Sequence, residues 1–122
     1  MSKLYESMTF GTDGLFYSLD PAKNEFFVTI KALAETTTLP RGTVLALTAE
    51  NKMIVLGSGE GTANCILCDD TEVGASDVKA VAYRAGHFTA EKLHMADGYT
   101  LTAADKETLR TLGILVSNAM EQ

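Results

Sequence analysis

The sequence predicts a mostly β fold: a small β-barrel or sandwich-like core with one or two short helices and an extended N-terminal arm. Short apolar runs recur along the chain and are separated by turn-forming residues, which is typical of strands joined by turns. One segment near the C-terminus carries the start and stop signals of a longer helix. Because 122 residues fit one domain, we expect residues 1–20 to form a flexible arm and residues 21–122 a single β-rich domain.

Residues 1–20 are the least regular part of the sequence. Gly11 and Gly14 interrupt this segment, which is too rich in glycine for a stable helix and too apolar for a fully solvated tail. Its apolar side chains are those of Leu4, Tyr5, Met8, Phe10, Leu15, Phe16, Tyr17 and Leu19. Two interpretations are open: a terminal strand or coil packed on its own domain, or an arm that becomes ordered on a partner.

The first clear strand pattern covers residues 26–33. Alternation places Val28, Ile30 and Ala32 on one face. Pro40 and Gly42 then mark a turn, and the apolar runs at residues 44–47 and 53–56 are typical of buried strands. Further strands are expected at residues 63–68, 78–83 and 114–116, with loops at 58–62 and 69–77 and a break at 86.

Two helical segments are expected after these strands. Thr89 begins a short helical turn that ends near Leu93. In the longer helix Thr102 can accept the free amide of Asp105 as the N-cap, and Gly113 suits the left-handed position after the last turn. The buried side of this helix is expected to consist of Ala104, Thr108, Leu109 and Leu112.

Composition argues against several classes of partner. The chain has 10 Lys and Arg against 16 Asp and Glu, a formal net charge of −6, and no basic cluster. Because binding to a nucleic-acid backbone needs clustered cations, no direct nucleic-acid partner is expected. No apolar run approaches the roughly 20 residues that span a bilayer, so no membrane partner is expected. The first residues lack the apolar centre of a secretory signal, and we expect the chain to fold in a reducing cytoplasm.

Cys65 and Cys68 form a C-x-x-C pair, the spacing of zinc ribbons and thiol oxidoreductases. Here the pair lies in a strand-like run, and because side chains alternate along a strand, the two thiols should face opposite sides. The following Asp69 and Asp70 would also oppose thiol ionisation. We therefore predict inert buried thiols, with metal binding and redox chemistry as the alternatives.

Three other groups resemble functional sites only in composition. The spacing between His87 and His94 exceeds that of the usual zinc motif, and no nucleophile motif accompanies them. The loop carboxylates lack the EF-hand pattern; they are Asp69, Asp70, Glu72 and Asp77. The glycine-rich segment 57–62 lacks the lysine of a phosphate loop. The sequence thus predicts no catalytic residue, no cofactor and no metal.

Five segments occur in a single order along most of the chain. They are RGTVLAL at residues 41–47, KMIVL at 52–56, ANCILCDD at 63–70, AVAYRAGHFTAEKL at 80–93 and LRTLGI at 109–114. In this order and spacing they resemble the lambda-type bacteriophage head decoration proteins, also called capsid cement proteins, over about residues 28–114.

The resemblance implies a structural virion protein rather than an enzyme. It implies homotrimers on the outside of the expanded head at local threefold positions, stabilising the major capsid protein shell against packaged DNA, after synthesis in the host bacterial cytoplasm. Together with this resemblance, the arm interpretation assigns capsid binding to Leu4, Tyr5, Met8, Phe10, Leu15, Phe16 and Tyr17. Two other classes stay open: a small β-barrel of the tail or baseplate, and a C-x-x-C thiol or zinc protein.

Overall fold

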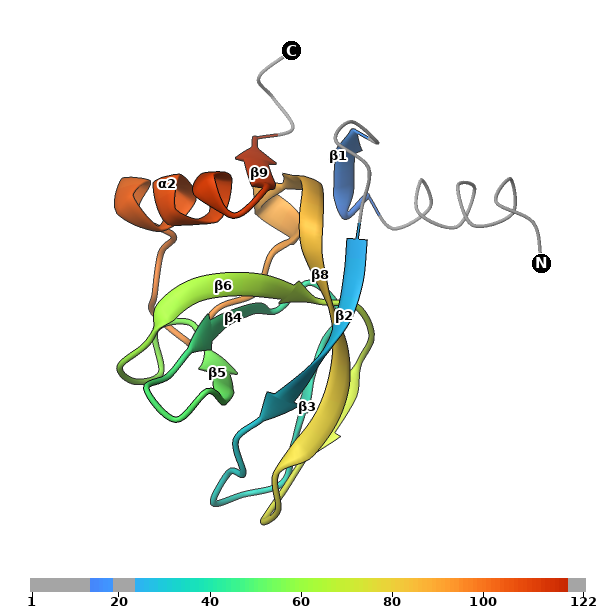
Figure 1. Cartoon of the computed structure of the whole chain (residues 1–122), viewed down its shortest axis with the longest axis vertical. Helices are drawn as coiled ribbons and strands as arrows, with labels where there is room; N and C mark the ends of the chain where they lie inside the picture. Colours follow the sequence, from blue (N-terminus) through green and yellow to red (C-terminus); the bar gives the residue numbers. More distant parts are fainter. Residues whose placement is uncertain (1–13, 19–23, 119–122) are drawn as a thin grey trace, which may run out of the picture.

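The computed structural model describes residues 14–18 and 24–118, and these residues are built around a closed five-stranded β-barrel (Figure 1). Around the barrel the strands follow the order β8-β2-β5-β4-β6, and β6 pairs again with β8. The barrel strands are β2 (Asn24–Ile30), β4 (Val44–Leu47), β5 (Met53–Val55), β6 (Thr62–Leu67) and β8 (Val78–Thr89). The predicted mostly β fold class is confirmed.

The remaining elements extend the barrel at its two ends. Strands β1 (Phe16–Ser18) and β9 (Ile114–Ser117) both pair with the last part of β8. Strands β3 (Thr37–Leu39) and β7 (Thr71–Val73) pair with each other in a separate two-stranded sheet. The sequence pattern missed both of these, and β7 lies inside the predicted acidic loop. The helical elements are η1 (Ala90–Lys92) and α2 (Ala103–Thr111).

Strand β8 organises the fold because it pairs with β2 and β6 along its first half and with β1 and β9 along its second. The predicted break at Gly86 is wrong, since the strand continues to Thr89. Gly86 has a φ of 145°, and a Cβ atom there would lie 3.0 Å from the ring of Phe88. The missing side chain therefore lets the strand pass an aromatic ring without ending.

The buried side chains form two clusters on either side of the central strands. Along β4, Val44 and Ala46 belong to the first cluster and Leu45 to the second. Val28 and Ile30, which were predicted to share one face, are both buried, but the strand ends at Ile30, and Ala32 lies beyond it. The alternation along β4 between the two clusters is what a strand with both faces covered requires.

Helix α2 confirms its predicted ends but only part of its predicted buried side. The Asp105 amide donates to Thr102 Oγ1 at 3.0 Å in a capping box, and Gly113 has a φ of 100°. Leu109 is fully buried, whereas Leu112 is 47% exposed and Ala104 is exposed as well. Leu112 is the C-cap residue, where the chain already turns away toward β9.

At η1 the prediction was only partly right. Thr89 occupies the N-cap position, but its side chain makes no capping hydrogen bond. Its amide instead donates to the Leu15 carbonyl at 2.8 Å. Neither helix of the described segments has the length and apolar character needed to cross a membrane.

Candidate functional site

The structure places the predicted arm residues in two groups. Leu4, Tyr5, Met8 and Phe10 lie outside the described residues. Leu15, in contrast, is only 2% exposed and belongs to the first core cluster. The ring centroid of Phe16 lies 5.0 Å from that of Tyr83 and 4.9 Å from that of Phe88.

Tyr17 continues this packing, with its ring centroid 4.4 Å from that of His87. Residues 15–17 therefore pack on their own domain, which corrects the expectation that the flexible arm extends over them. The physical reason is that β1 has pairing partners on β8, which alternation within residues 1–20 could not reveal.

Arg41 fastens this N-terminal strand to the barrel. Its Nη1 donates to the Tyr83 hydroxyl at 2.7 Å and to the Cys68 carbonyl at 2.8 Å. Its Cζ also lies 5.9 Å from the Phe16 ring centroid, within the range of a cation–π contact. Burial raises the pKa of Tyr83 to about 12, so the hydroxyl stays protonated at neutral pH. No sequence signal distinguishes Arg41 from a surface arginine.

The two thiols lie in different clusters, Cys68 in the first and Cys65 in the second, which confirms that they face opposite sides. Both are free and buried, and burial raises the pKa of each to about 12. A protonated thiol is a poor nucleophile and a poor metal ligand. Within residues 14–18 and 24–118, no three side chains of His, Cys, Asp or Glu are grouped to hold a metal ion.

The other polar groups singled out from the sequence are dispersed. The Nε2 of His87 lies 2.8 Å from Ser117 Oγ, while His94 is exposed. Asp70 accepts the Arg41 amide at 2.8 Å. Asp77 lies 2.7 Å from Lys52 and accepts the Ala32 amide at 2.9 Å, and the hydrogen bond from Lys52 lowers its pKa. His87, Asp70 and Asp77 thus each have a local structural partner.

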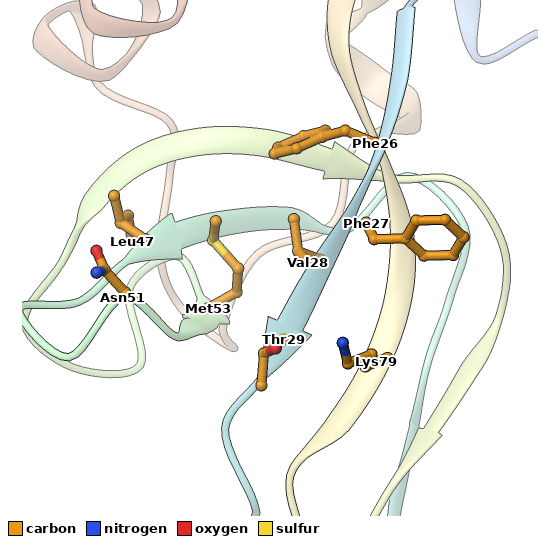
Figure 2. A pocket seen from close by; sticks show the side chains of 8 residues that line it. All are labelled: Phe26, Phe27, Val28, Thr29, Leu47, Asn51, Met53 and Lys79. Carbon is orange, nitrogen blue, oxygen red and sulfur yellow. The ribbon is translucent and has the colours of Figure 1, made fainter.

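A large exposed apolar side chain lies on the barrel surface. Phe27 on β2 is 77% exposed, and it borders a hollow of about 290 Å³ between β2 and the ends of β4 and β5 (Figure 2). We call this hollow the seam groove; its lining residues are Phe26, Phe27, Val28, Thr29, Leu47, Asn51, Met53 and Lys79. The alternation that puts Val28 and Ile30 on one face implies that Phe27 lies on the other, but it did not indicate a groove.

The seam groove continues into a neighbouring hollow of about 260 Å³, with which it shares Phe26, Leu47 and Met53. Arg84 lines this second hollow, and its Cζ lies 4.4 Å from the Phe26 ring centroid. The exposed Leu112 also lines it. Such a surface offers apolar contact area and positive charge, as expected of a protein-binding surface.

Comparison with known families matches residues 15–115 to the family described as bacteriophage lambda head decoration protein D. The chain belongs to this family. The match begins at Leu15, the buried residue just before β1, and ends inside β9, so it covers the barrel, β1 and the first part of β9. This head decoration protein is therefore a structural component of a phage head. A search of curated proteins found no match.

Proposed function

We propose that this head decoration protein binds the outside of the expanded head as trimers at local threefold positions and stabilises the shell against the pressure of packaged DNA. The family match over residues 15–115 carries this proposal. Its direct partner is the major capsid protein, and it acts by binding, without catalytic turnover. It is made in the host bacterial cytoplasm and ends on the capsid surface.

The physical requirement is many copies of a moderate interface. A ligand that binds one state of an assembly stabilises that state by mass action. Trimers that each contact several capsid subunits also gain from multivalency, because later contacts form at high effective concentration. Binding that favours the expanded lattice thus opposes its disruption.

We further propose that the arm before Gly14 contacts the capsid as an extended segment. The apolar side chains of Leu4, Tyr5, Met8 and Phe10 would supply the buried contacts. Residues 15–17 pack on the barrel, so they would anchor the C-terminal end of this arm. Any capsid contact made by residues 15–17 would be made from this packed position. Deleting residues 2–13 should therefore leave the barrel folded and weaken head binding.

The test uses purified heads that lack decoration protein, in expanded and unexpanded forms. We expect cryo-electron microscopy to show threefold clusters on expanded heads and little binding to unexpanded ones. Equal binding to both forms, or isolated single copies, contradicts the proposal. Binding to purified tails but not to heads supports a tail or baseplate component, and stoichiometric zinc in the purified protein supports the C-x-x-C alternative.

A further inference from the structure

The two edges of β2 differ in their pairing. On one side, every residue from Asn24 to Ile30 has a register partner on β8. On the other side, Ile30 alone pairs with β5, opposite Met53. Among the residues that the structure describes, no strand pairs with residues 26–29 on this second side. The backbone there borders the seam groove, and an open strand edge is a template for another extended chain.

The side chains along this edge suit an added strand. Phe26 and Val28 lie on the groove side of β2, next to Leu47 and Met53, whereas Phe27 points to the other side (Figure 2). Successive side chains of an added strand would alternate in the same way. One set would cover the apolar groove, and the other would lie beside the exposed ring of Phe27 as a cross-strand neighbour.

Two basic side chains of β8, the strand on the paired side of β2, line the hollows near the two ends of residues 26–29. Lys79, the register partner of Thr29, lines the seam groove, and Arg84, which stacks on Phe26, lines the neighbouring hollow. In the described part of the chain, neither lies within ion-pair distance of a carboxylate. Three other basic residues do form ion pairs: Lys31 with Glu50, Lys52 with Asp77, and Arg110 with Glu107.

This charge pattern selects the occupant. The chain has a net charge of −6, yet the groove ends in cations, so a complementary segment carries carboxylates. If a second copy paired through the same edge across a twofold axis, its Lys79 and Arg84 would lie close to those of the first copy, and like charges at this distance are unfavourable. Residues 26–29 span roughly 10 Å when extended, which sets the separation of the carboxylates.

We propose that an extended segment of the major capsid protein, with carboxylates flanking about four residues, adds as a strand to the β2 edge in the seam groove. This inference rests on the proposed function and names the surface through which the barrel itself contacts the shell. Main-chain hydrogen bonds to residues 26–29 supply affinity, while Phe27 and the two cations select the segment.

The test measures the affinity of the full-length protein and its variants for purified expanded heads that lack decoration protein. Phe27→Ser and Lys79→Glu should each weaken binding by about tenfold or more, as expected for contacts at the centre of an interface. One matched control should stay within about twofold of the unmodified protein. Lys106→Glu makes the same charge change as Lys79→Glu but lies outside both hollows.

Amide exchange of the unmodified protein provides a second readout that needs no variant. Binding to heads should slow exchange within residues 26–29. If the unmodified protein fails to bind heads, the proposed function fails and this inference with it. If it binds, but Phe27→Ser and Lys79→Glu bind equally well or residues 26–29 gain no protection, only the inference is overturned. A loss of trimers in sedimentation without a change in head affinity would assign the groove to a second copy and overturn it too.

Discussion

Replacing Phe16 by alanine tests whether β1 belongs to the folded domain. The ring of Phe16 contacts Tyr83 and Phe88 and receives the Arg41 guanidinium on its face. Complete removal of a buried Phe side chain costs about 3–5 kcal/mol. Phe16 is only partly buried, so we expect about 2 kcal/mol, of which its aromatic pairs supply roughly half.

Urea denaturation of the full-length protein measures this loss, and thermal unfolding should show a midpoint lower by roughly 8 °C. Phe27→Ala is the matched control, because it removes the same side chain from a strand where 77% of it is exposed. That control should cost no more than about 0.5 kcal/mol. Equal effects of the two substitutions would mean that the Phe16 ring is not packed and that the free arm extends through it.

Three further outcomes follow from the packing. Burial raises the pKa of Cys65 and Cys68 from 9.0 to about 12, so as pH rises the unfolded chain loses these thiol protons before the folded protein does. The free energy of unfolding should therefore fall as pH rises from 9 toward 12. The fall should be smaller in the double variant Cys65→Ala with Cys68→Val. Unchanged pH dependence in urea titrations would refute this. Thr102→Ala should cost about 1 kcal/mol through loss of the N-cap, and no loss would show that the capping bond does not form. Gly57→Ala should cost more than about 1 kcal/mol, since φ is 94° and its Cβ would lie 2.5 Å from Tyr99; a neutral result would mean that the ring moves away freely.

The sequence determined the features that depend on near neighbours. Alternation placed Val28 and Ile30 on one face of β2 and separated the two thiols, because side-chain direction along a strand follows from its backbone. The ends of α2 were predictable, since Thr102 and Gly113 act within one turn of the helix. The order of five short segments also indicated the family that the comparison then showed.

Tertiary structure decided the features whose partners lie far away in sequence. Strands β3 and β7 are short and contain Thr. Each is stabilised by pairing directly with the other, although β4, β5 and β6 lie between them in the sequence. The packing of Phe16 depends on Tyr83 and Phe88, and its own segment gives no sign of them. The seam groove exists because β2 and β5 meet at a single register pair. The point at which two neighbouring strands separate depends on how the whole barrel closes, so no local sequence pattern encodes that point.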